Sequence, residues 1–95
     1  MQLRESGYRR WLAGLPPGQV VGRAQDCFAC PLAGYLRAQG EVYAEVRPSF
    51  YSWDDFESRR LPVWARRHVR AVDALPMWSR ITAGEALAML NGGGA

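Results

Sequence analysis

Apolar positions recur every three or four residues in two long stretches of the chain, a spacing that predicts amphipathic helices. The first stretch, residues 3–15, ends at Pro16-Pro17, because the residue before a proline is pushed out of the helical region and proline has no N–H to donate. The second stretch, residues 62–75, begins with Pro62 in its first turn and ends before Pro76. We expect these two helices to supply most of the core.

A third helix is predicted over residues 31–39, and Gly40 ends it. Its start has two solutions. If Asp26 caps the helix, Pro31 lies too deep and removes a backbone hydrogen bond, whereas if Pro31 is the first helical residue, Cys30 takes the capping position. We favour the second solution, with a tight turn through residues 27–30.

Short strands are predicted where apolar and polar side chains alternate. Residues 41–47 alternate with a period of two, which is typical of a strand with one solvent-facing side. Residues 50–53 and Val20-Val21 are further strand candidates, and residues 54–61 are expected to be a polar connection with room for one helical turn. Pro48-Ser49 is not a strong hairpin turn, so the pairing of the strands on either side of it stays open.

A capping box predicts a short last helix that begins after Thr82. The Thr82 hydroxyl and the Glu85 carboxylate are spaced to bond each other's backbone N–H groups, and Ile81 with Ala86 is placed as a hydrophobic staple. We expect the helix to close at Asn91-Gly92, with residues 92–95 as a flexible Gly-rich tail.

These elements predict a small α+β domain over residues 1–91, with about four short helices around a minimal sheet of two or three strands. An all-α fold is the alternative. A chain of 95 residues excludes a two-lobed enzyme. The side chains expected in the core are Trp11, Leu12, Leu15, Leu32, Leu36, Val42, Val46, Trp64, Val72, Leu75 and Leu87.

The charged residues add information that the apolar pattern lacks. All twelve basic residues are arginine, and the formal net charge is +3. Without lysine, catalysis through a lysine Schiff base or a phosphate-loop lysine is excluded. Residues 41–58 hold five acids against Arg47, giving −4, and residues 59–80 hold six arginines against Asp73, giving +5. Such blocks either pair inside the fold or present faces of opposite sign to partners.

The strongest candidate surface for a partner surrounds the helix at residues 62–75. Guanidinium groups suit phosphates, and aromatic rings suit stacked bases, although an ordinary solvated helix face explains the same arginines. The predicted partner-binding residues are Arg59, Arg60, Arg66, Arg67, Arg70, Trp53 and Trp78.

Cys27-x-x-Cys30 is the one recognisable chemical motif. A thiolate at a helix N-terminus is stabilised by unpaired backbone N–H groups and becomes a nucleophile or a metal ligand. A dithiol oxidoreductase needs a strand before the motif in a βαβ unit, and a zinc site needs four ligands, for which the chain adds only His68 and a carboxylate. Packing of two small apolar side chains is the simpler reading, so we expect no cofactor. His68 lies near the apolar face of its helix and is expected to be packed with one ring nitrogen hydrogen-bonded.

Function is predicted by elimination. One histidine, no lysine, no complete ligand set and no phosphate loop leave little catalytic equipment, whereas Trp, Tyr and Arg are the residue types enriched at binding hot spots. We therefore expect a non-enzymatic interaction or regulatory protein of prokaryotic or phage type that binds a macromolecule, foremost a protein. Nucleic-acid binding through the arginines of residues 62–75, and a thiol or zinc-dependent activity at Cys27 and Cys30, are the alternatives.

The apolar runs bear on location. The longest one, residues 86–90, is far too short to span a membrane, and the first ten residues carry charges where a signal peptide has an apolar core. We therefore expect a cytoplasmic protein without a membrane partner.

Overall fold

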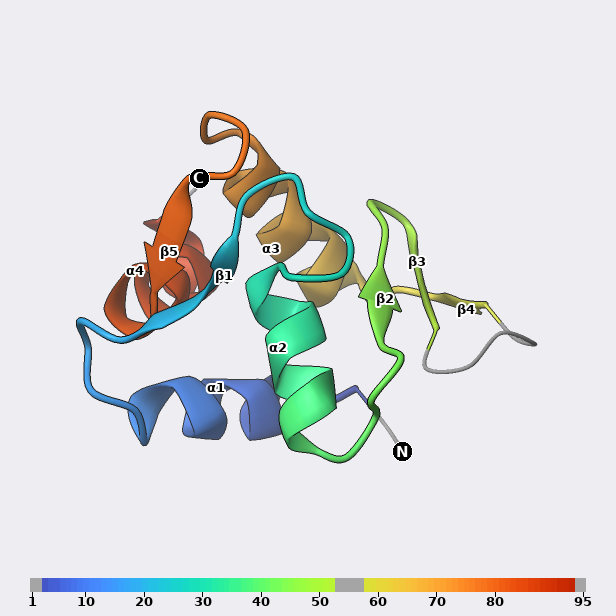
Figure 1. The fold of residues 1–95 in the computed structure, drawn as a ribbon, viewed down its shortest axis with the longest axis horizontal. Helices are drawn as coiled ribbons and strands as arrows, with labels where there is room; N and C mark the ends of the chain where they lie inside the picture. Colours follow the sequence, from blue (N-terminus) through green and yellow to red (C-terminus); the bar gives the residue numbers. More distant parts are fainter. Residues whose placement is uncertain (1–2, 53–57, 94–95) are drawn as a thin grey trace.

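Four α-helices and two small antiparallel sheets form the part of the chain that the computed structural model describes, residues 3–52 and 58–93 (Figure 1). The helices are α1 (Glu5–Ala13), α2 (Pro31–Ala38), α3 (Val63–Asp73) and α4 (Ala83–Ala88), and α4 runs on into the turn η1 (Met89–Gly93). One sheet pairs β1 (Val20–Arg23) with β5 (Arg80–Thr82), and the other has the order β2 (Glu45–Val46), β3 (Phe50–Ser52), β4 (Arg59–Arg60). The α+β prediction is confirmed, and the all-α alternative is wrong.

The two amphipathic helices form where the apolar spacing predicts them, with slightly narrower bounds. Both α1 and α3 end before a proline, as expected from the backbone restrictions that proline imposes. Tyr8 and Leu12 of α1 are fully buried, and α3 buries Val69 and Val72 together with His68. No helix in the described ranges is long and apolar enough to cross a membrane.

The start of α2 follows the second of the two predicted solutions. Cys30 is the N-cap and its Sγ accepts a hydrogen bond from the backbone N–H of Ala33, with Pro31 at the first helical position. The Asp26 carboxylate instead accepts hydrogen bonds from the backbone N–H groups of Phe28 and Ala29, at 3.0 and 3.1 Å. These bonds hold the tight turn that leads into α2.

The predicted strand at residues 41–47 is mostly wrong. The Ala44 N–H donates to the Glu41 carbonyl, so residues 41–44 form a turn and only Glu45–Val46 remain extended as β2. The turn breaks the alternation, and Val42, predicted in the core, is 70% exposed. The pairing of β2 with β3 exists, with Val46 opposite Tyr51. Part of the predicted polar connection is a strand, because Arg59–Arg60 pairs with β3 as β4.

The last part of the chain contains one strand that sequence patterns did not predict. Residues 80–82 form β5 and pair with β1, which buries Ile81 completely. The predicted capping box is confirmed, because the Thr82 hydroxyl accepts a hydrogen bond from the Glu85 N–H and the Glu85 carboxylate accepts one from the Thr82 N–H.

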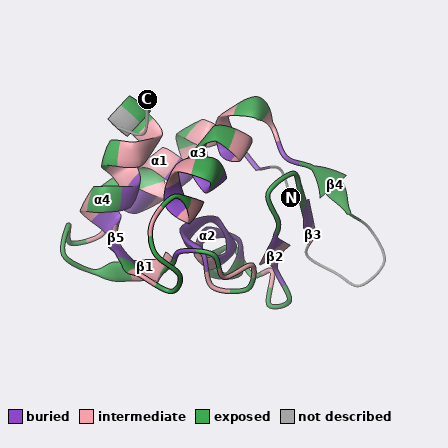
Figure 2. Cartoon of the chain, turned by 90° about the horizontal axis from the view of Figure 1, so that it is seen from above, coloured by how far each residue is buried: buried purple, intermediate pink, exposed green. Residues whose placement is uncertain are grey.

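The core is centred on α2, whose residues are mostly buried between the flanking elements (Figure 2). Of the predicted core, Leu12, Leu32, Leu36, Val46 and Val72 are buried. The remaining predictions apart from Val42, which are Trp11, Leu15, Trp64, Leu75 and Leu87, are partly buried and pack against this core. Tyr8, Leu61 and Ile81 are large buried side chains that the predicted set lacks.

Candidate functional site

The outer face of α3 carries arginines that pair with no acid in the described part of the chain. Arg67 and Arg70 are exposed and Arg66 is half-buried, and none of the three forms an ion pair with a carboxylate of residues 3–52 or 58–93. The ion pairs found there join near neighbours, Arg9 with Glu5 and Arg47 with Glu45. Within the described ranges, these three arginines of α3 therefore carry positive charge that no carboxylate pairs with.

The described members of the predicted partner-binding set lie on different elements. Arg66, Arg67 and Arg70 share α3, but Arg59 and Arg60 lie on β4, which extends away from α3 and from the β1–β5 sheet (Figure 1). Trp78 lies in the turn between α3 and β5 and is 61% exposed. Trp53 lies outside the described residues. The arginines of α3 are therefore the part of the predicted surface that stays together.

Beside these arginines, α3 and η1 enclose a groove of about 610 Å³. Its lining is apolar along most of its length, with Glu5 of α1 also contributing. The lining residues are Glu5, Trp64, Arg67, His68, Arg70, Ala71, Ala74, Met89, Leu90 and Gly92. A groove of this size that combines apolar walls with a few polar groups is typical of ligand and peptide sites. Sequence reasoning missed Met89 and Leu90, whose only signal was their place after the capping box.

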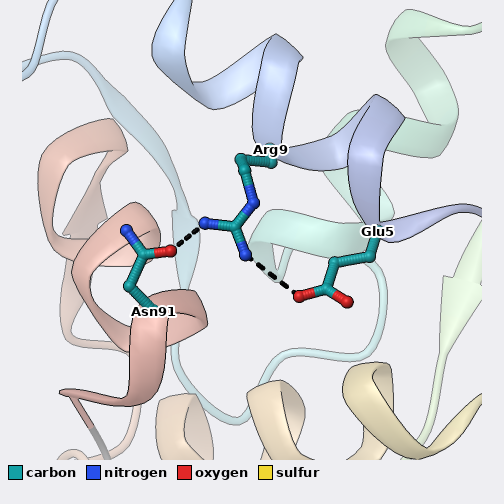
Figure 3. Close-up of polar contacts among 3 residues, drawn as sticks. All are labelled: Glu5, Arg9 and Asn91. Carbon is teal, nitrogen blue, oxygen red and sulfur yellow. Dashed lines mark hydrogen bonds and ion pairs between the residues drawn. The ribbon is translucent and has the colours of Figure 1, made fainter.

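The groove wall formed by η1 is tied to α1 through Arg9 (Figure 3). The Arg9 guanidinium donates to the Glu5 carboxylate at 3.0 Å and to the side-chain oxygen of Asn91. The acidic group that lines the groove is thus already paired with an arginine. Among the described residues, Arg67 and Arg70 are the charged residues that line the groove without an ion-pair partner, which favours a positive potential there.

His68 lines the same groove from the buried side of α3. Its Nε2 atom lies 2.7 Å from the Tyr8 hydroxyl, in a hydrogen bond. Its Nδ1 atom is buried and has no hydrogen-bond partner in the described part of the chain, and the residue is only 2% exposed. Burial lowers the pKa of His68 to about 4, so the ring is neutral at neutral pH. The expectation of a packed histidine with one bonded nitrogen is confirmed.

The two cysteines lie apart from this groove. Cys27, half-buried, and Cys30, buried, line a smaller cavity of about 320 Å³ together with Asp26 and Asp73. Burial raises the pKa of Cys30 to about 11, which outweighs the lowering by backbone N–H groups at the start of α2. Cys30 is therefore a neutral thiol that caps a helix. No group of three or more His, Cys, Asp or Glu residues in the described chain is placed to hold a metal ion.

Slow alkylation of Cys30 is the expected consequence of its raised pKa. In a Cys27→Ala variant, the folded protein should react with iodoacetamide about a hundredfold more slowly than expected for a thiol with the ordinary pKa of 9.0, because the shift to about 11 lowers the thiolate fraction by that factor. Mass spectrometry at a series of times, with and without urea, measures both rates. Rapid labelling of the folded variant would contradict the burial of this thiol.

Comparisons of this chain with protein families, with curated proteins and with solved structures find no match, so its function is argued from the geometry of the groove and the charges beside it.

Proposed function

We propose that this protein is a non-enzymatic interaction protein that binds an acidic, amphipathic segment of a partner protein in the groove between α3 and η1. The observation that carries the proposal is the position of Arg67 and Arg70, which pair with no carboxylate of residues 3–52 or 58–93, in a groove with apolar walls. An amphipathic segment suits both features at once, because its apolar face fills the groove while its carboxylates reach the arginines.

The composition of the groove favours a protein segment over a nucleic acid. Trp64, Met89 and Leu90 offer aromatic and aliphatic surface that leucine-like side chains cover well, while a phosphate backbone has no apolar group to place there. Trp and Arg are also the residue types that dominate binding energy at protein interfaces. The charges then select acidic partners, since Glu5 is already paired with Arg9.

The spacing of the two arginines also specifies the partner. Arg67 and Arg70 are three residues apart on one helix, which places their Cβ atoms about 5–6 Å from each other. Carboxylates three or four residues apart on a partner helix have the same separation, so each guanidinium meets one carboxylate.

Binding of designed peptides tests the proposal. The probe is a helical peptide of about 15 residues with leucines on one face and glutamates spaced four apart beside them; a second peptide carries lysines in place of the glutamates. The glutamate peptide should bind and the lysine peptide should not. Binding should weaken about tenfold or more in the Arg67→Gln/Arg70→Gln variant, because two charge-assisted contacts are lost. Fluorescence titration measures both affinities.

The matched control is the Arg23→Gln/Arg80→Gln variant, which removes the same charge from two exposed arginines of the β1–β5 sheet. Peptide affinity should change little in this control, apart from the weaker long-range attraction that follows net charge. Equal losses in the two double variants, or equal binding of both peptides, would show that the groove does not select an acidic segment.

A further inference from the structure

Two arginines lie directly opposite each other in the β1–β5 sheet. The register pairs Arg23 with Arg80, and both side chains are exposed. Cross-strand partners project on the same side of a sheet with Cβ atoms about 4.5–5.5 Å apart, so the two positive charges are close neighbours. Like charges in this arrangement destabilise a sheet. The pair therefore costs stability in the free protein.

No carboxylate of the described residues neutralises this pair. Two acids near this end of the sheet accept other hydrogen bonds: Asp26, three residues after Arg23, accepts from the N–H groups of Phe28 and Ala29, and Asp73 accepts from the backbone N–H of Gln25 at 2.9 Å. Two arginines placed in this way suit an anion with several acceptor oxygens, such as a phosphate, because each guanidinium group can donate to a different oxygen.

An exposed tryptophan adjoins the arginine pair. The Trp78 N–H donates to the Ala24 carbonyl, and the Ala24 N–H donates to the Ser79 carbonyl, so Trp78 lies next to the residues that follow Arg23 and precede Arg80. Trp78 is 61% exposed and has a φ of +63°, a backbone conformation that residues other than glycine rarely adopt. The positive φ belongs to the turn of residues 76–79, which the hydrogen bond from the Ser79 N–H to the Pro76 carbonyl closes. The exposure of the ring is the feature that this turn does not explain.

We infer that Arg23, Arg80 and Trp78 form a site for single-stranded nucleic acid, separate from the groove between α3 and η1. The two arginines hold a backbone phosphate, and the Trp78 ring stacks on an adjacent base. A single strand fits better than a duplex, because its bases expose the flat faces that stacking needs, while a duplex keeps them covered. The site contacts a backbone phosphate and the flat face of a base, and every nucleotide offers both. We therefore expect little sequence preference.

Three variants separate binding from stability. Arg80→Glu replaces the like-charge pair by an ion pair with Arg23, so the melting temperature should stay the same or rise while binding is lost. Trp78→Gly removes the ring and suits the positive φ, so stability should be retained while affinity for the strand falls at least about fivefold. Arg10→Glu, an equal charge change at an exposed position of α1, is the control and should keep most of the affinity.

The experiment titrates each variant with a fluorescent 12-nucleotide oligothymidylate at several salt concentrations. We expect wild-type binding that weakens with salt, and a slope of log Kd against log salt that falls by about 0.7 for each phosphate contact removed. The Arg67→Gln/Arg70→Gln variant should still bind the oligonucleotide, so failure of this site and failure of the groove are distinguishable.

Several results would overturn the inference. One is the absence of any binding to the oligonucleotide at low salt; another is equal affinity of the wild type and the Arg80→Glu variant. Tighter Arg80-dependent binding to a DNA duplex, or to vesicles of anionic phospholipid, would assign the arginine pair to a different partner and reject the single strand.

Discussion

Acidification from pH 7 to pH 4 should remove about 3 kcal/mol from the free energy of unfolding through His68 alone. The pKa of this buried ring is lowered from 6.5 to about 4 in the folded protein. Between these two values the unfolded chain binds a proton that the folded chain does not, so stability falls as the pH drops through this window. Well above pH 6.5 the ring is neutral in both states, and its contribution levels off.

The Tyr8→Phe/His68→Phe variant is the control for this effect. It removes both partners of the buried hydrogen bond, so neither position leaves an unpaired polar group behind. The variant also has no imidazole at position 68 that takes up a proton between pH 7 and pH 4. Urea unfolding at pH 7, 5.5 and 4 gives the free energy for both proteins. The carboxylates contribute to both curves, so the difference between them isolates the histidine. Parallel curves would show that His68 takes up its proton without a cost to the fold.

Local signals predicted the helices well because they depend on residues close together in the sequence. The apolar spacing of α1 and α3, the Cys30-Pro31 start of α2 and the Thr82–Glu85 capping box each involve backbone groups within a few residues. Cap residues bond the backbone at a fixed offset, so their spacing alone determines where a helix begins. For this reason the four helices were found before any tertiary contact was known.

The strands were predicted in part: β1 and β3 form at the candidates Val20-Val21 and residues 50–53, whereas β5 was missed because its partner is distant in the sequence. A strand of three residues such as β5 shows no period of its own, and it exists because residues 80–82 pair with β1, nearly sixty residues earlier. The alternation of residues 41–47 predicts Val42 in the core, whereas the backbone turns between Glu41 and Ala44. A turn of this kind is decided by bonds that the alternating pattern does not report.

The candidate sites could be predicted only in part, for the same reason. The arginines of α3 follow from helical spacing, but the groove beside them needs η1, which is held near α1 by the bond between Arg9 and Asn91. The opposed pair of Arg23 and Arg80 depends on a register that no local pattern contains. In both cases the sequence supplied the chemical groups, and long-range contacts decided which of them meet.

Replacement of Gly22 by alanine should destabilise this protein by more than about 4 kcal/mol, at the upper end of single substitutions. A Cβ atom at this position would lie 2.5 Å from the Ala29 carbonyl oxygen, 2.6 Å from the Pro31 nitrogen and 2.7 Å from the Cys30 carbonyl carbon. All three are backbone atoms, so no side-chain rotation relieves the overlap. Strand β1 would have to move away from the start of α2.

That movement would also disturb hydrogen bonds on which the fold depends. The Arg23 N–H donates to the Ala29 carbonyl at 2.8 Å, and it would be displaced together with Gly22. Ile81, opposite Gly22 in the sheet, would lose part of the packing that buries it completely. Since domains are stable by only about 5–15 kcal/mol, the variant should melt at least about 15 °C lower or fail to fold.

Gly18→Ala is the matched control, because a Cβ at position 18 meets no atom within 4 Å. It should leave the melting temperature unchanged or raise it slightly, since alanine restricts the unfolded chain more than glycine does. Circular dichroism during heating measures both variants under the same conditions. A Gly22→Ala protein that melts with the wild type would mean that β1 does not approach α2 this closely; a loss confined to Gly22→Ala places the restriction at this contact, because both variants make the same chemical change.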